Sequence, residues 1–174
     1  VNLQYELSNG IQFTSITDFK DYEKLLFIDV DAAPANQLAN YAGVDATSFT
    51  QEFRLNGETE RTRWVAGAFY LNIDTTSDNG LKAPVNSIAG SPPFAPVDIG
   101  VVADLETNSY SVFGQVDYDL TETLTLTAGA RLIQEEKDFD LLIAIFPSFD
   151  SFTVNQGDPI PNAFGAGSPY TNTD

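Results

Sequence analysis

Apolar and polar residues alternate through Leu120–Leu132, whose sequence is LTETLTLTAGARL. On a β-strand this period of two places Leu124 and Leu126 on one side and Thr125 and Thr127 on the other. The pattern predicts a strand with one apolar and one polar face. Soluble sheet proteins and membrane β-barrels both use such strands, so the rest of the chain has to distinguish them.

Similar alternation recurs in three pairs of segments within residues 1–139. We expect each pair to form a β-hairpin, because turn-forming residues separate its two segments. The paired segments are residues 1–7 with 11–27, 46–55 with 62–73, and 108–120 with 124–138. The short turns are expected at residues 8–10, 56–61 and 121–123. The predicted fold class is all-β, with about six long antiparallel strands.

The segments between and after these hairpins are long and contain all nine prolines of the chain. They are predicted loops at residues 29–45 and 74–106, and a long loop or tail rich in Pro, Gly and Asn at residues 140–174. Proline cannot donate to a sheet ladder, which supports these boundaries. Short turns at one end and long loops at the other are typical of outer-membrane barrels. We therefore interpret the strands as part of a transmembrane β-barrel, with a soluble β-domain as the alternative.

The composition excludes several classes of function. The chain has 25 acidic and 8 basic residues, and this net charge of −17 disfavours nucleic acids and anionic membrane surfaces as partners. It has no cysteine and no histidine, which excludes disulfides, thiolate or imidazole metal sites and histidine-based catalysis. No nucleophile elbow, phosphate loop or metalloprotease motif occurs. We expect no enzymatic activity and no catalytic residues.

Two kinds of side chain remain as candidates for binding. Asp29 and Asp31 open a predicted loop, where backbone carbonyls can complete the ligand shell of calcium or another divalent cation. The alternative is that they are ordinary polar residues at a strand end. The candidates for ligand binding are Arg54, Arg63, Arg131 and Trp64. Arginine suits anionic ligands. The alternatives are ion pairs between strands for the arginines and an interfacial aromatic girdle for the tryptophan.

Three segments of the chain resemble strands of TonB-dependent outer-membrane receptors. Two are similar to mid-barrel strands, SFTQEFRLNGETERTRWVAGAFYLN (Ser48–Asn72) and YSVFGQVDYDLTETLTLTAGARLIQEEKDF (Tyr110–Phe139). The third, GIQFTSITDFKDYEKLLFIDVD (Gly10–Asp31), looks like the preceding strand and loop. The long loops resemble nothing that we can name.

The resemblance implies a barrel of about 22 strands, closed by an N-terminal plug, in the outer membrane of a Gram-negative bacterium. It also implies uptake of a scarce ligand, of the siderophore, vitamin or glycan class, driven by the TonB complex through the plug. The printed sequence contains no plug and no TonB box, so we expect a fragment of such a barrel. The remaining barrel strands and outer-membrane lipid would be its partners.

An alternative hypothesis is that the open β-edges of such a fragment pair with further copies of it. The product would be an extracellular, amyloid-like cross-β filament with a structural role. The most assembly-prone segment is the apolar, proline-free run Leu141, Leu142, Ile143, Ala144, Ile145 and Phe146. Stacking in register would repeat the charge of −17 in every layer. Assembly would therefore require low pH or divalent cations between the carboxylates.

Overall fold

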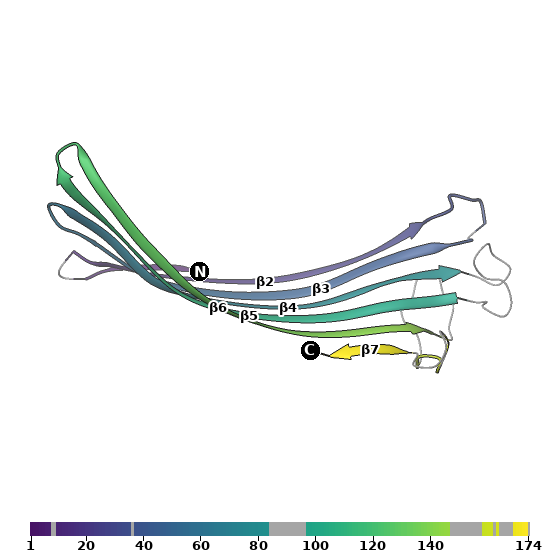
Figure 1. The fold of residues 1–174 in the computed structure, drawn as a ribbon. Helices are drawn as coiled ribbons and strands as arrows, with labels where there is room; N and C mark the ends of the chain where they lie inside the picture. The colour runs from purple at the N-terminus through teal and green to yellow at the C-terminus, as the bar shows by residue number, and fades with distance from the viewer. Residues whose placement is uncertain are drawn as a thin grey trace. The chain divides into compact units, whose positions relative to one another are not determined.

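The computed structural model forms a single antiparallel sheet of seven strands, and no helix occurs among the residues that it describes (Figure 1). None of the described part of the chain therefore offers a helical membrane span. The strands are β1 (Asn2–Glu6), β2 (Gln12–Asp29), β3 (Ala39–Glu58), β4 (Thr62–Ala83), β5 (Val97–Thr121), β6 (Leu124–Ile145) and β7 (Tyr170–Thr173). The described residues are 1–7, 10–35, 37–83, 97–146, 158–161, 163 and 169–173.

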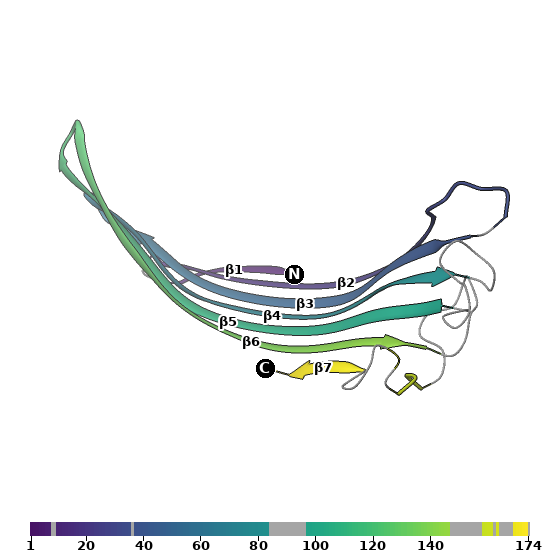
Figure 2. The same cartoon turned by 45° about the vertical axis from the view of Figure 1, so that its right-hand side comes forward.

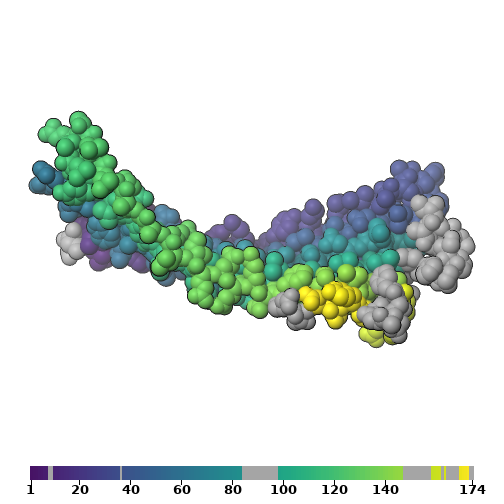
Figure 3. All heavy atoms as spheres, viewed as in Figure 1, coloured from purple at the N-terminus to yellow at the C-terminus, as the bar shows by residue number. Residues whose placement is uncertain are grey.

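The strands follow one another across the sheet in their order along the chain, from β1 to β7. This order confirms the predicted fold class, an all-β sheet of long antiparallel strands. β1 pairs with β2 in a register that runs from Asn2 opposite Ile16 to Glu6 opposite Gln12. At the other edge, β7 lies beside β6, with Ile143 opposite Tyr170 (Figures 2 and 3). The sheet is open, with β1 and β7 as its two edge strands.

The sequence prediction missed β7, placed the starts of β3 and β5 too late, and placed the ends of β4 and β6 too early. β3 begins at Ala39 and β4 continues to Ala83, β5 begins at Val97 and β6 continues to Ile145. Parts of the predicted loops 29–45 and 74–106 and of the tail 140–174 are therefore strand. The extension of β4 is polar on both sides of the strand, as in the DTTSDNG run after Ile73, whereas the extension of β6 contains the apolar run LLIAI. Neither shows the alternation on which the prediction relied.

The predicted turns also shift. The Asn56–Gly57 pair lies inside β3 rather than in the turn, and the chain reverses at residues 59–61, where Thr59 and Thr62 exchange backbone and side-chain hydrogen bonds. Gly57 lies in β3 against the Trp64 ring, where a Cβ atom would come 2.9 Å from the indole Nε1. Ser8 and Asn9 of the first predicted turn lie outside the described residues, and Gly10 has a positive φ of 75°.

The chain divides into two compact units, each built from segments of several strands. The first unit comprises residues 1–20, 47–73 and 107–137, and the second comprises residues 21–46, 74–106 and 138–174. The buried apolar residues of the described part all belong to the second unit: Ala39, Tyr41, Ala83, Ala144 and Phe146. The buried residues of the described part of the first unit are Gly57 and the small polar residues Thr14, Thr107, Ser109 and Ser111. The first unit is thus a sheet segment without an apolar core of its own.

Candidate functional site

One face of the first unit is lined by aromatic rings that contact one another across the strands. Phe49 of β3 lies 6.2 Å from Tyr70 of β4, and Tyr70 lies 5.0 Å from Tyr110 of β5, measured between ring centroids. Phe13 of β2 stacks on Phe53 of β3 at 6.0 Å. Because side chains alternate along a strand, every second residue from these positions lies on the same face. We call this surface the apolar face.

The apolar face is exposed over most of its extent. Its large exposed side chains include Leu3, Tyr5, Phe19, Phe53, Leu55, Tyr110, Val112, Val116, Tyr118, Leu120, Leu124, Leu126 and Leu132. Leu132 is 73% exposed and Leu126 57% exposed. Leu124–Leu132 lies within β6, as predicted, so Leu124, Leu126 and Leu132 lie on one side of the strand. A continuous apolar surface of this kind is rare on a soluble monomer and indicates a surface that contacts something apolar.

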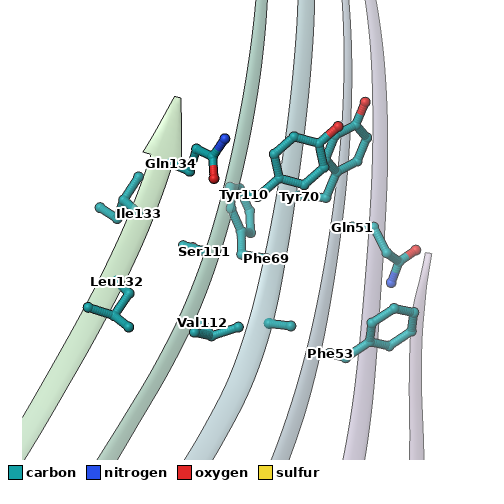
Figure 4. A pocket seen from close by; sticks show the side chains of 11 residues that line it. Gln51, Phe53, Phe69, Tyr70, Tyr110, Ser111, Val112, Leu132, Ile133 and Gln134 are labelled. Carbon is teal, nitrogen blue, oxygen red and sulfur yellow. The ribbon is translucent and has the colours of Figure 1, made fainter. Parts of the chain in front are cut away.

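A shallow groove of about 550 Å³ lies on this face (Figure 4). The rings of Tyr70 and Tyr110 stand together at one end, Phe53 lies on one side, and Leu132 lies on the other. Ala68 of β4 also lines the groove, and its small side chain leaves space between these larger ones. The groove is also lined by Gln51, Phe69, Ser111, Val112, Ile133 and Gln134.

Two asparagines, Asn72 and Asn108, lie next to the tyrosines at one end of the apolar face. The Tyr70 hydroxyl and the Asn72 amide both donate to Asn108 Oδ1, each at 3.0 Å. From these asparagines toward the β5–β6 turn, the apolar stretch of β5, Tyr110–Leu120, spans eleven residues. The apolar stretch of β6, Leu124–Leu132, spans nine. These lengths match the 9–11 residues that a tilted strand needs to cross a hydrocarbon layer.

The opposite face of the first unit carries the charged side chains, and we call it the charged face. All four ion pairs described in this unit lie on it: Lys20–Asp18, Arg54–Glu52, Arg63–Asp119 and Lys137–Glu135. The Arg63 guanidinium donates to both carboxylate oxygens of Asp119, at 2.9 and 3.0 Å. Exposed pairs of this kind contribute little stability. They show that the charged side chains of these strands lie on the face opposite the aromatic rings.

Arg131 is an exposed cation of the charged face that lies against two aromatic rings. Its guanidinium carbon lies 5.7 Å from the centroid of the Phe69 ring and 5.9 Å from that of Phe113, and its Nη2 donates to Ser111 Oγ at 2.8 Å. The Phe113 ring fits there because position 67 is glycine, where a Cβ atom would come within 2.5 Å of the ring. The arginine is thus held by two aromatic rings and one hydroxyl.

The structure separates the four predicted ligand-binding residues into two groups. Arg54 and Arg131 line one cavity of about 730 Å³ on the charged face. Arg63 and Trp64 line another, of about 580 Å³. The interpretation of the arginines as partners in ion pairs fits Arg54 and Arg63, whereas Arg131 is held by rings and a hydroxyl. A role in ligand binding stays a prediction for all four residues.

A family model described as TonB dependent receptor-like, beta-barrel matches residues 1–173 of this chain. The chain belongs to the TonB-dependent receptor family. It is a segment of a TonB-dependent receptor barrel, as the resemblance of its strands predicted. No solved structure matches the chain.

In this receptor segment the carboxylates of the predicted metal ligands, Asp29 and Asp31, accept hydrogen bonds from backbone amides. Asp29 Oδ1 accepts from the amides of Asp31 and Ala32, both at 3.2 Å. The Asp31 carboxylate accepts from three further amides, including that of Leu38 at 2.7 Å. These bonds order the loop after β2. The described residues contain no group of three or more acidic side chains that could hold a metal ion, and calcium binding at this pair stays a prediction.

The predicted assembly segment lies in the sheet of the receptor segment. Residues 141–145 end β6, where β7 pairs with residues 140–143, and the next residue, Phe146, donates its amide to the Asp98 carbonyl at 2.7 Å. Ala144 and Phe146 are buried. Its role in filament assembly stays a prediction.

The sequence analysis did not single out a buried ionic cluster in the second unit. Lys82 Nζ donates to Asp98 Oδ2 at 2.5 Å and lies 5.5 Å from the centroid of the Tyr41 ring, and all three residues are fully buried. The second carboxylate oxygen, Asp98 Oδ1, has no partner among the described residues. Burial raises the pKa of Asp98, and the hydrogen bond and charge of Lys82 act in the opposite direction.

Tyr41 in the same cluster packs closely on the neighbouring strand. A Cβ atom at Gly80 would come within 2.4 Å of the ring, so only glycine fits beneath it. Burial, together with the charges of Asp78 and Asp98, raises the pKa of the Tyr41 hydroxyl. The sequence held one weak signal for this cluster. Lys82 is one of only two basic residues in the acidic second unit, the other being Lys24, so an ion pair with a carboxylate could have been expected.

Proposed function

We propose that the first unit is a section of the wall of an outer-membrane barrel, with its apolar face toward lipid and its charged face toward the lumen. The separation of charge between the two faces supports this most directly. Among the described strand residues of this unit, Glu136 is the only charged residue that alternation places on the apolar face. Lipid solvates only apolar side chains, whereas a water-filled lumen solvates charged ones.

We further propose that the complete receptor takes up a scarce ligand across the outer membrane of a Gram-negative bacterium, with energy supplied through TonB. Family membership supports transport rather than catalysis. The ligand class would be a siderophore, a vitamin or a glycan. The cavity that Arg54 and Arg131 line on the charged face offers cationic groups for an anionic ligand, which favours a carboxylate-bearing or phosphate-bearing compound.

Site-directed spin labelling of the receptor in lipid bilayers tests the orientation of the two faces. The printed chain has no cysteine, so cysteines introduced at Val116 and Leu126 on the apolar face, and at Gln115 and Thr127 on the charged face, are unique within it. Oxygen dissolved in the bilayer should broaden the nitroxide spectra at 116 and 126 and leave those at 115 and 127 little changed. Equal accessibility at neighbouring positions would contradict the proposal.

Uptake assays test the transport proposal separately. Cells that carry the receptor should accumulate a radiolabelled ligand of the right class, and accumulation should stop when TonB is deleted or the proton gradient is collapsed. Charge-neutral variants Arg54→Gln and Arg131→Gln should reduce accumulation if the cavity on the charged face binds the ligand. Uptake that persists without TonB would contradict energy coupling, whatever the ligand.

A further inference from the structure

Contacts between β2, β3 and β4 show which side chains of the second unit share a face of the sheet. A Cβ atom at Gly43 of β3 would lie 3.5 Å from Leu25 Cδ1 of β2 and 3.6 Å from Asp78 Cβ of β4. These three positions therefore lie on one face. Because side chains alternate along a strand, every second residue from each of them lies on that face too.

Contacts of β5 and β6 extend the same face across the unit. Thr76 of β4 donates its hydroxyl to Asp104 of β5 at 2.6 Å. The Phe146 amide donates to the Asp98 carbonyl at 2.7 Å, so these two residues face each other at the end of β6. The same step along both strands brings Asp140 opposite Asp104, and both carboxylates line a hollow of about 240 Å³.

Alternation from these contacts places every carboxylate of the unit's described strands on this one face, which we call the carboxylate face. Its only cation is Lys82, which pairs with Asp98. On the opposite face, which we call the carboxylate-free face, the only charge of the described strands is Lys24. The eleven carboxylates are Asp21, Glu23, Asp29, Asp45, Asp74, Asp78, Asp98, Asp104, Glu106, Asp138 and Asp140.

Stability of the sheet does not explain this arrangement. Asp104 lies opposite Asp140, and two residues further along the strands Glu106 lies opposite Asp138. Like charges directly opposite each other destabilise a sheet, and a division of the carboxylates between the two faces would weaken this repulsion. The sorting therefore indicates a requirement on the face from which carboxylates are absent.

We propose that the carboxylate-free face lines the path of an anionic ligand, and that the sorting allows this acidic unit to admit an anion. The proposal rests on the proposed function, which gives the ligand carboxylate or phosphate groups. A sheet with its side chains is about 10 Å thick. This thickness exceeds the screening length of about 8 Å at physiological salt. An anion beside the carboxylate-free face is thus shielded from the carboxylates, and Lys24 attracts it.

Thiol reagents of opposite charge test the potential at the two faces. Ser77 and Thr76 are neighbours on β4 with small hydroxyl side chains, Ser77 on the carboxylate-free face and Thr76 on the carboxylate face. The printed chain has no cysteine, so Ser77→Cys and Thr76→Cys each introduce one thiol into it. Cells that carry the complete receptor are treated with either of two membrane-impermeant methanethiosulfonates, which carry a sulfonate or a trimethylammonium group.

The ratio of the sulfonate rate to the trimethylammonium rate is the measurement, because differences in thiol reactivity cancel in it. In dilute buffer this ratio should be about tenfold higher at position 77 than at position 76, and concentrated salt should reduce the difference. Equal ratios, or a lower ratio at position 77, would overturn the proposal. No reaction at position 77 with either reagent would also overturn it, because a ligand path is open to water.

A charge swap at two adjacent residues tests the sorting itself. Asp78→Asn combined with Asn79→Asp keeps the net charge and the side-chain sizes, and moves one carboxylate to the carboxylate-free face. In the Ser77→Cys background this swap should slow the sulfonate reagent about threefold. Asp78→Asn alone is the matched control and should not slow it. A sulfonate rate that the swap leaves unchanged would overturn the electrostatic argument.

The spin-label experiment distinguishes failure of this proposal from failure of the proposed function. If positions 116 and 126 contact lipid but the reagent ratios at positions 76 and 77 are equal, the barrel orientation stands and the sorting proposal fails. If positions 116 and 126 do not contact lipid, the proposed function itself fails.

Discussion

The two units of this receptor segment differ in charge and in what they bury. The first has ten acidic and six basic residues, a net charge of −4, and its described large apolar side chains are mostly exposed on one face. The second has fifteen acidic and two basic residues, a net charge of −13, and buries Tyr41, Ala144 and Phe146. The difference shows that the same strands can serve two environments. In the proposed barrel wall, lipid would cover the apolar face of the first unit, whereas the second unit buries apolar side chains of its own.

The largest effect should come from breaking the buried ion pair of the second unit. Lys82→Met leaves the buried Asp98 carboxylate without the only side-chain partner that the described residues give it, which should cost about 3–5 kcal/mol of unfolding free energy at pH 7. Loss of Lys82 also raises the pKa of Asp98 further. The folded state of the variant then binds a proton more readily than the unfolded state, so its stability should fall as the pH rises through that raised pKa.

Urea unfolding of the lipid-reconstituted receptor between pH 4 and pH 8 measures this effect. The cost of Lys82→Met should shrink toward acid pH, where protonated Asp98 needs no counter-charge. The double variant Lys82→Met with Asp98→Leu is the control, and it should recover most of the stability at all pH values. A single variant as stable as the wild type at pH 7 would mean that the pair is not buried as described.

A charge on the apolar face should have the next largest effect. Leu126→Arg places a guanidinium where lipid is expected and should cost about 2–4 kcal/mol near the middle of the bilayer. Thr127→Arg, the next residue on the charged face, should cost much less. Equilibrium refolding into lipid vesicles measures both variants. Equal losses of stability in the two variants would contradict the proposal that only the apolar face meets lipid.

Substitution of a crowded glycine should have an intermediate effect in the first unit. Gly67→Ala places a Cβ atom 2.5 Å from the Phe113 ring and 2.6 Å from the Phe53 carbonyl, which should cost about 1–3 kcal/mol. Gly114→Ala is the control, because the nearest atom to its Cβ lies at 3.6 Å, an ordinary contact. The same refolding assay compares them, and a Gly114 variant as unstable as the Gly67 variant would contradict the packing argument.

The smallest effect should come from the stacked arginine of the charged face. Arg131→Gln removes the contacts with Phe69 and Phe113 and should cost about 0.5–1 kcal/mol. Arg61→Gln, in the turn between β3 and β4, makes a matched loss of one positive charge without a ring contact, and its stability should be unchanged. The difference between the two urea midpoints is the measurement. No difference would mean that the rings contribute nothing.

The sequence predicted the first unit far better than the second, for a physical reason. In the first unit one face is apolar and the other is charged, so alternation of apolar and polar residues marks each strand, as from Leu124 to Leu132. In the second unit the strands are polar on both sides over residues 74–80, and only their partners in the sheet show that they are strands. β7 was missed because it has four residues in a segment that reads as a tail.

The contacts of the candidate sites were harder to predict than the faces on which they lie. The sequence placed Arg54 and Arg131 on polar positions correctly, but their shared cavity depends on the order of β3 to β6. Lys82 and Asp98 both fell inside the predicted loop 74–106, and only the extension of β4 and β5 brings them together in the sheet. Trp64 rests on Gly57 because the glycine is in the strand rather than in the turn.

The absence of an apolar core from the described part of the first unit has a consequence for how this sequence can change over evolutionary time. A core selects residues by shape, because each side chain must fit its neighbours. A fluid hydrocarbon layer has no fixed shape, so positions such as Leu124 and Val116 should exchange freely among leucine, valine, isoleucine and phenylalanine. Ala68 and Gly67 should resist such exchange. Among homologous receptors, the size of the side chains on this face should therefore vary widely, whereas their apolar character should be kept.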